Sequence, residues 1–209
     1  MRHLLTLLAV LGATATVAQD LTHASTIALR SDHGLYLSAQ DDGRLVADRQ
    51  DAGEWETFLI RRVPVNPGGT MHYGQHLNLR SSHRRWVAGE ENGGAKADRE
   101  AAGPWEDWTI HNAGDLSSTT AIACGDRVAL KSSHGTYLVA EEGGGVKADR
   151  GAVGAWESWT LQCQSVAPKP IQSLSDLGQN EAFFLRDLTS GGFVRIDGDR
   201  LVNDSAIAY

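Results

Sequence analysis

One motif dominates the sequence: it begins Leu29-Arg30-Ser31-Asp32-His33-Gly34-Leu35-Tyr36-Leu37-Ser38-Ala39 and continues with Ala47-Asp48-Arg49 and Gly53-Glu54-Trp55-Glu56. Two further copies follow it along the chain. The histidine of each copy (His33, His83 and His134) marks a spacing that is constant to within one residue. Matches in a fixed order and at a fixed period are the signature of a repeat architecture. The sequence therefore predicts a fold built from three equivalent units.

Each copy has the pattern of four short strands separated by turns. In the first copy the expected strands cover residues 26–30, 35–39, 44–47 and 55–60. Apolar residues alternate in the last of these, as in a half-buried strand. The turn between the second and third strands is rich in glycine in copies two and three, where glycine supplies the positive φ of a tight hairpin.

A unit of about fifty residues is too small to bury its own apolar face, so the three copies must share one core. The predicted fold class is all-β: a β-trefoil of three four-stranded repeats with pseudo-threefold symmetry. In that fold the first and fourth strands of each unit form a short barrel, and the middle hairpins cap one end. A three-bladed propeller is the alternative, disfavoured because propellers typically have about four to eight blades.

The repeat resembles that of the fascin family. The shared pattern is His-Gly-x-Tyr-Leu-x-Ala, a glycine-rich hairpin, Ala-Asp-Arg, and Gly-x-Trp-Glu-x-Phe/Trp, found at residues 33–58, 83–108 and 134–159. The resemblance implies a β-trefoil and, as the family's best-known activity, cross-linking of actin filaments. Family members that bundle actin have four trefoils in tandem and work in the cytosol. This chain has one predicted trefoil and an export signal, so the resemblance extends to the fold and leaves the bundling activity open.

The N-terminus has the pattern of a secretory signal. Arg2 is followed by the apolar run 4–11 and by the small residues Thr16-Val17-Ala18, which together predict a signal peptide at residues 1–18, cleaved after Ala18. An uncleaved membrane anchor is the weaker alternative, because the apolar run is shorter than the ~20 residues that span a bilayer. No later stretch is apolar enough to insert into a membrane, so we expect a secreted or periplasmic protein.

Beyond the signal, we assign residues 19–164 to a fascin-like β-trefoil domain, 165–180 to a linker and 181–209 to a partial fourth repeat. The last segment repeats a first strand and a hairpin but has no Trp-Glu. It either packs as a satellite hairpin or offers an edge strand through which the protein forms an oligomer with another chain.

Charge and cysteine content restrict the function. The formal net charge is −7, without the basic patch of a nucleic-acid binder, so no nucleic-acid partner is expected. Cys124 and Cys163 flank the third copy. In an exported protein such a pair predicts a disulfide, with two free thiols as the alternative.

Residues that recur in every copy are expected to have structural roles. The histidines His33, His83 and His134 should have a structural job, such as a hydrogen bond that closes the first turn. A metal site is the less favoured alternative, because zinc ligands must converge on one point. The tryptophans Trp55, Trp105 and Trp156 should fill the core, with Phe58, Trp108 and Trp159 three positions on. A sugar-stacking platform is the less favoured alternative for the tryptophans.

The Asp-Arg pairs that end the third strands are also expected to be structural, with each arginine pairing to the glutamate of the Trp-Glu that follows. The acidic pairs at the hairpin tips, such as Glu90-Glu91, read as solvated turns, with calcium binding as an alternative. Adjacent carboxylates on a strand point to opposite faces and make a poor acid/base pair.

A difference between the copies marks the candidate ligand-binding site. Copies one and three have His-Gly-x-Tyr, whereas copy two has His83-Arg84-Arg85-Trp86. Arginines beside a tryptophan form a planar surface for stacking and hydrogen bonding to a sugar or carboxylate. Neutral drift in an exposed turn is the alternative.

No catalytic constellation, metal motif or cofactor motif is present in the sequence, so we expect no catalytic residues, no metal and no cofactor. The predicted function is a non-enzymatic exported binding module for a polysaccharide or glycan. The alternatives are a protein-binding module, for an actin-type filament or a secreted enzyme that it inhibits, and a structural envelope component. The expected partner is thus a glycan or an extracellular protein.

Overall fold

The computed structural model describes residues 20–65, 69–164, 185–186, 193–197 and 200–204. The chain divides into two compact units, Met1–Ser165 and Val166–Tyr209. The expected signal peptide and linker fall outside the described residues. In the second unit the described residues form a three-stranded antiparallel sheet of β13 (Leu185–Arg186), β14 (Phe193–Asp197) and β15 (Arg200–Asp204). Its origin as a partial fourth repeat stays a prediction.

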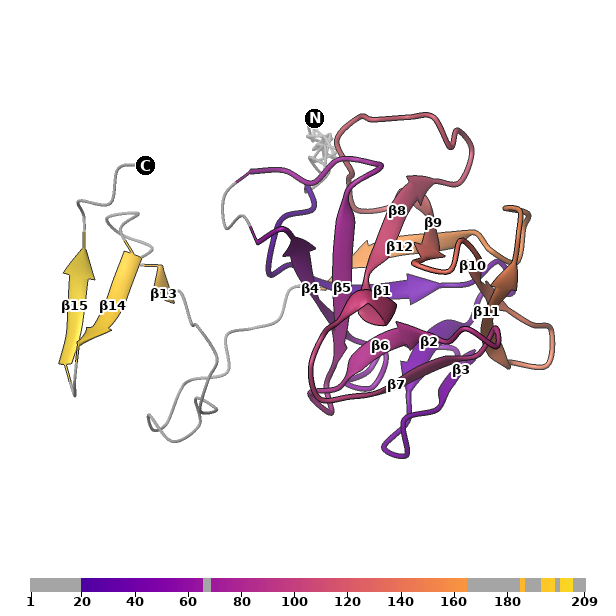
Figure 1. Ribbon diagram of the computed structural model, residues 1–209, viewed down its shortest axis with the longest axis horizontal. Coiled ribbons are helices and arrows are strands. Elements are labelled where there is room, and N and C mark those ends of the chain that lie inside the picture. Colours follow the sequence, from indigo (N-terminus) through magenta and orange to yellow (C-terminus); the bar gives the residue numbers. More distant parts are fainter. Residues whose placement is uncertain (1–19, 66–68, 165–184, 187–192, 198–199, 205–209) are drawn as a thin grey trace, which may run out of the picture. The chain divides into compact units, whose positions relative to one another are not determined.

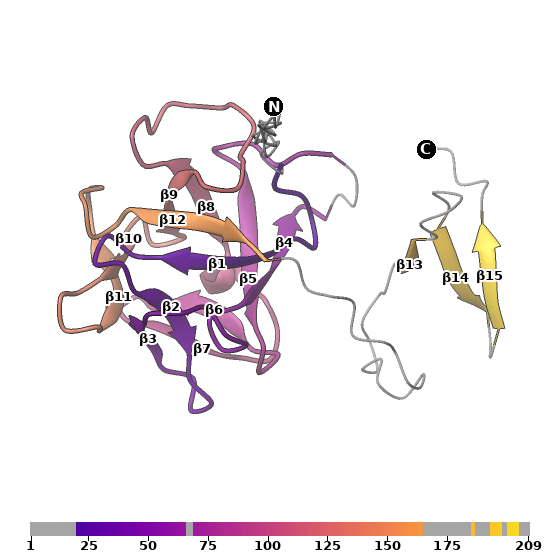
Figure 2. The same cartoon turned by 180° about the vertical axis from the view of Figure 1, so that it is seen from behind.

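The first unit is all-β with a β-trefoil-like fold, and a closed six-stranded barrel lies at its centre (Figures 1 and 2). Every barrel strand pairs antiparallel with two others, and the first pairs with the last through Ile27↔Cys163. The barrel strands are β1 (Thr26–Arg30), β4 (Phe58–Val63), β5 (His76–Ser81), β8 (Trp108–Asn112), β9 (Arg127–Ser132) and β12 (Trp159–Cys163).

Three hairpins lie side by side at one end of the barrel (Figure 1). Each follows a first strand and precedes a fourth strand, as the repeat predicts. Their strands are β2 (Tyr36–Ala39) with β3 (Leu45–Arg49), β6 (Trp86–Gly89) with β7 (Ala95–Arg99), and β10 (Tyr137–Ala140) with β11 (Val146–Arg150). A single 3₁₀ turn, η1 (Pro104–Glu106), precedes β8.

The hairpins are joined in a ring by backbone hydrogen bonds. The N–H of the alanine in each Ala-Asp-Arg donates to the glycine carbonyl of a neighbouring hairpin tip, over 2.8 Å in each of the pairs Ala97–Gly43, Ala148–Gly93 and Ala47–Gly144. Glycine is required at these tips. Gly43 has a φ of +85°, and a Cβ there would lie 2.8 Å from the Cβ of Asp98.

A second ring closes the other end of the barrel. The Leu21 N–H donates to the Ile122 carbonyl, the Ile122 N–H to Met71, and the Met71 N–H to Leu21, over 2.7–2.9 Å. All three side chains are fully buried. The three short segments that precede the first strands therefore form an apolar floor under the core.

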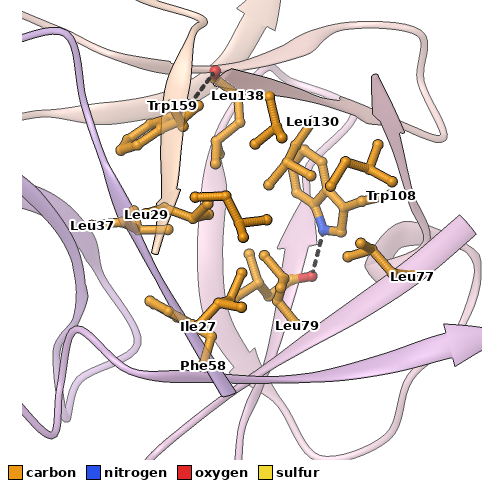
Figure 3. Packing of buried hydrophobic residues seen from close by; sticks show 14 of the residues in the cluster. Ile27, Leu29, Leu37, Phe58, Leu77, Leu79, Trp108, Leu130, Leu138 and Trp159 are labelled. Atoms are coloured by element: carbon orange, nitrogen blue, oxygen red, sulfur yellow. Dashed lines mark hydrogen bonds between the residues drawn. The ribbon is translucent and has the colours of Figure 1, made fainter. Parts of the chain in front are cut away.

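The core consists of equivalent residues from the three copies, and it includes two large aromatics, Trp108 and Trp159 (Figure 3). Trp108 and Trp159 are fully buried, and their indole N–H groups donate to the carbonyls of Val87 and Leu138. Phe58 takes the equivalent place in the first copy. A buried tryptophan needs such a hydrogen-bond partner, because an unpaired N–H away from water is costly.

The predicted disulfide is confirmed. Cys124 and Cys163 are bonded, with 5.4 Å between their Cα atoms. Cys163 is the last residue of β12, and Cys124 lies just before β9. The bond therefore links the segment that leads into the third copy with the strand that closes the barrel.

Candidate functional site

The expectation that Trp55, Trp105 and Trp156 fill the core is wrong. Their side chains are 37%, 37% and 36% exposed, whereas the aromatics three positions on are fully buried. The reason is local: the fourth strands begin at Phe58, Trp108 and Trp159, not at the earlier tryptophans, which lie in the preceding turns. The less favoured alternative, a sugar-stacking platform, stays a prediction.

Each exposed tryptophan contacts the histidine of another repeat. The ring centroids lie 5.3 Å apart for His33–Trp156, 5.0 Å for Trp55–His83 and 5.3 Å for Trp105–His134. The Nε2 atoms of His33 and His83 also lie within hydrogen-bond distance of the Ala140 and Ala39 carbonyls. These histidines therefore join neighbouring repeats. The structural role expected of the histidines takes this form, and the hydrogen bonds of His33 and His83 go to a neighbouring repeat and not to their own first turn.

A buried glutamate holds the turn that carries each tryptophan. The Glu106 side chain is 4% exposed, and its Oε2 accepts the Gly103 N–H over 2.6 Å. Its other oxygen lies 3.6 Å from Arg99 Nε. Glu56 and Glu157 make the same two contacts, with Gly53 and Arg49 and with Gly154 and Arg150. Because the glutamate faces inward, the tryptophan one position earlier faces outward.

Exchanging Glu157 for glutamine is expected to lower the free energy of unfolding by about 1–2 kcal/mol, because a charge-assisted hydrogen bond at a buried position becomes a neutral one. Urea unfolding would measure the loss. Glu142→Gln is the matched control, since this exposed carboxylate of the same repeat should change stability by less than about 0.5 kcal/mol. Equal midpoints for the two variants would contradict the structural role.

Trp105 lies at two neighbouring depressions of the surface. It lines a shallow surface depression of about 410 Å³ together with Arg99, Ala101, Ala102, Gly103, Pro104 and Glu106. A second depression of about 340 Å³ is lined by Trp105, Glu90, Glu91 and Asn92. The indole of this η1 residue thus lies beside the β6–β7 hairpin tip, and polar groups are available next to an apolar ring.

The one guanidinium at this site is already paired. Arg99 lies 2.7 Å from Glu90, 2.9 Å from Asp98 and 3.6 Å from Glu106, and its Cζ is 5.9 Å from the centroid of the Trp105 ring. The sequence-based pairing of the repeated arginine with the glutamate of Trp-Glu is thus observed here. Arg99 helps to orient the indole.

The surface expected at Arg84, Arg85 and Trp86 does not have an open aromatic face. Trp86 is only 8% exposed, and its ring is covered by Arg61 and Arg80, whose Cζ atoms lie 4.8 and 5.4 Å from its centroid. Arg85 forms an exposed ion pair with Glu100. The structure brings Trp86 to arginines of the barrel strands, so the prediction that it stacks on a ligand is corrected.

The surroundings of Trp86 explain why copy two has a tryptophan where copies one and three have a tyrosine. Tyr36 and Tyr137 occupy the equivalent places, each with a cation from the first strand over its ring, Arg30 and Lys131. The Tyr36 hydroxyl donates to Gln162 of β12, whereas the corresponding neighbour of Trp86 is Arg61 of β4. An indole that packs against two guanidiniums replaces a phenol that donates to an amide.

Arg84 has a left-handed backbone. Its φ is +63°, and the equivalent positions are Gly34 and Gly135, at +80° and +84°. A side chain in this region is disfavoured relative to glycine. Arg84 itself is exposed and stays part of the ligand site that the sequence proposes.

The hairpin tips carry exposed carboxylates. Asp41, Glu91 and Glu142 are exposed at equivalent positions. Next to the first of them, the hydrogen bond from the Arg44 side chain lowers the pKa of Asp42 below its usual value. Within the described residues, no group of three or more histidine, cysteine or acidic side chains is arranged to hold a metal ion. Over the same residues, no helix has the length and apolar character needed to cross a bilayer.

Comparison with known proteins supports the fold. The crystal structure of the SDF2-like protein from Arabidopsis thaliana matches with a TM-score of 0.56, covering 68% of this chain and 94% of that chain, at 16% sequence identity. At that identity the likeness concerns the fold alone. No curated protein sequence gives a significant match.

The sequence itself matches the family model of the Fascin domain over residues 13–110. That range includes the first copy of the repeat and most of the second, with the turn that carries Trp105. This match confirms the resemblance drawn from the repeated motif, and the fold is β-trefoil-like.

Proposed function

We propose that this domain is a non-enzymatic, exported binding module that recognises a polysaccharide or glycan at Trp105. The observation that carries the proposal is an indole that is 37% exposed between two depressions, with carboxylate and amide groups at its side. The Glu106–Gly103 hydrogen bond fixes the turn that carries this indole, so the ring is presented to a partner in a preorganised position.

The chemistry of the site fits a sugar. The face of an indole carries partial negative charge, and it attracts the partially positive C–H groups on one face of a pyranose ring. Asn92 and Glu91 line the same depression and offer donors and acceptors for hydroxyl groups. Apolar stacking with a few polar groups at the edge is a common composition for small-ligand sites.

A glycan-array and polysaccharide pull-down screen with the protein lacking residues 1–18 tests the proposal. Trp105→Ala should weaken binding by about ten- to a hundredfold, as loss of a central aromatic contact does, and should leave the melting temperature nearly unchanged. Trp105→Phe should retain part of the binding because it keeps a stacking face.

The double variant Arg84→Gly, Arg85→Ala is the control for the site proposed from sequence. It removes both side chains and places glycine where the other copies already have it. If this variant abolishes binding and Trp105→Ala does not, the ligand site lies at the turn of the second copy that carries Arg84 and Arg85. No binding by the wild type to any glycan would overturn the glycan proposal.

The Fascin-domain match favours a second candidate function, binding of a protein filament of the actin type. Co-sedimentation with filaments tests it directly. A single domain with one filament site should pellet with filaments without bundling them, because bundling requires two separated sites.

A further inference from the structure

We infer that the ligand of the Trp105 site is a positively charged amino-sugar polymer, and not a neutral or acidic glycan. The inference rests on the proposed function, because it names the ligand class of that same site. Its support is the balance of charge around the exposed indole.

Carboxylates outnumber cations at this site. Arg99 is the single guanidinium among the residues that line the two depressions, which also include Glu90, Glu91 and Glu106. Its ion pairs are made to Glu90, Glu106 and the neighbouring Asp98. A guanidinium that already faces three carboxylates has little attraction left for an acidic ligand, and an acidic ligand would also meet the repulsion of the remaining charge.

Glu91 is the group available to a cation. It lines the depression beside Trp105 and is exposed, and within the part of the chain that the structure describes no ion pair involves it. It lies in a hairpin tip where Gly93 has a φ of +84°, and the fold places this residue in the same depression as Trp105.

An amino sugar satisfies both groups at once. One face of its ring can stack on the indole, and its ammonium group is attracted by the π face of the ring and by the carboxylate of Glu91. A neutral sugar obtains only the stacking contact, and a uronate adds repulsion. The net charge of −7 acts in the same direction, because it raises the local concentration of a polycation and its rate of association.

The test compares three soluble hexasaccharides by isothermal titration calorimetry: β-1,4-linked glucosamine, its fully N-acetylated form, and a hexauronate. At a mildly acidic pH that protonates the amine, the free-amine hexamer should bind at least about tenfold more tightly than the N-acetylated one. The advantage should shrink between about 0.01 and 1 M salt, because exposed charges are screened.

Two variants that each remove one negative charge separate the local effect from the net charge. Glu91→Gln should weaken binding of the free-amine hexamer about two- to fivefold, the usual range for an exposed ion pair, and leave the N-acetylated hexamer unchanged. Asp115→Asn removes an exposed carboxylate of the β8–β9 loop and should change neither.

The contrary results are distinct from one another. Equal binding of the free-amine and N-acetylated hexamers, with both lost in Trp105→Ala, would overturn this inference and leave the proposed function standing. Preference for the hexauronate would overturn it as well. Polylysine that binds as tightly as the free-amine hexamer in both wild type and Trp105→Ala would show non-specific polycation binding. Failure of all three hexamers to bind would contradict the proposed function itself.

Discussion

Replacing Trp108 with alanine is expected to lower the free energy of unfolding by about 3–5 kcal/mol, the usual cost of removing a buried large aromatic side chain. Trp108 is fully buried, and its indole N–H donates to the Val87 carbonyl. The substitution leaves a cavity in the shared core and also removes a hydrogen-bond partner from a buried carbonyl. Since domains are typically stable by about 5–15 kcal/mol, this is a large part of the total.

Trp105→Ala is the matched control for this prediction, because it removes the same side chain three residues earlier at a position that is 37% exposed. We expect it to cost about 1 kcal/mol or less. Thermal unfolding followed by circular dichroism should show a fall in the melting temperature on the order of 10 °C for Trp108→Ala and a small fall for Trp105→Ala. Similar values for the two variants would contradict the assignment of one tryptophan to the core and the other to the surface.

Loss of the Cys124–Cys163 disulfide is expected to lower stability by about 2–4 kcal/mol. The bond closes a loop with a sequence separation of 39, and the chain-entropy account of disulfides gives a stabilisation on the order of 4 kcal/mol for a loop of that size. The double variant Cys124→Ser, Cys163→Ser should therefore unfold at a clearly lower urea concentration.

Reducing conditions provide the internal control for the disulfide. Wild-type protein in reductant should unfold near the midpoint of the double variant, and the variant itself should not respond to reductant. A wild-type midpoint that reductant leaves unchanged would mean that the bond adds little to the stability of the folded barrel.

Much of the β-trefoil-like fold could be predicted from the sequence, because the repeat carries the information. The strand expected at residues 26–30 forms as β1, and each glycine-rich turn lies at a hairpin tip. The disulfide could be predicted because the cysteines flank one repeat of a chain for which the sequence predicts export. These features depend on local pattern and on spacing along the chain.

The orientation of Trp55, Trp105 and Trp156 could not be predicted in the same way. Two large aromatics three positions apart can both be assigned to a strand that faces the core. The glutamate between them determines which aromatic is buried. Its side chain faces inward and accepts a hydrogen bond from a glycine N–H, so the first aromatic lies in a turn and the strand begins only at the second. The sequence did contain a clue: a glutamate stands between two large aromatic residues in every copy. A charged residue that recurs in an otherwise apolar segment indicates a specific hydrogen-bond or ion-pair partner.

The contacts between repeats also could not be predicted from the sequence. His33, for example, meets Trp156 from the other end of the domain, and only the closed ring of repeats places them together. The same holds for Trp86, which is covered by Arg61 of a different strand. The motif identifies which residues are special without showing which of them are neighbours in space.

The pairing of β1 with β12 has a consequence for how the domain is made. Ile27 finds its partner in Cys163, and Leu21 finds part of the floor in Ile122, so the earliest residues of the domain depend on the latest. Synthesis proceeds from the N-terminus, so the first repeat leaves the ribosome before the strands that pair with its edges. The barrel therefore remains unclosed until β12 has emerged, and pairings between such distant residues form slowly. Closure of the barrel is thus one of the last steps in the assembly of this domain, because it needs the first and the final strand together.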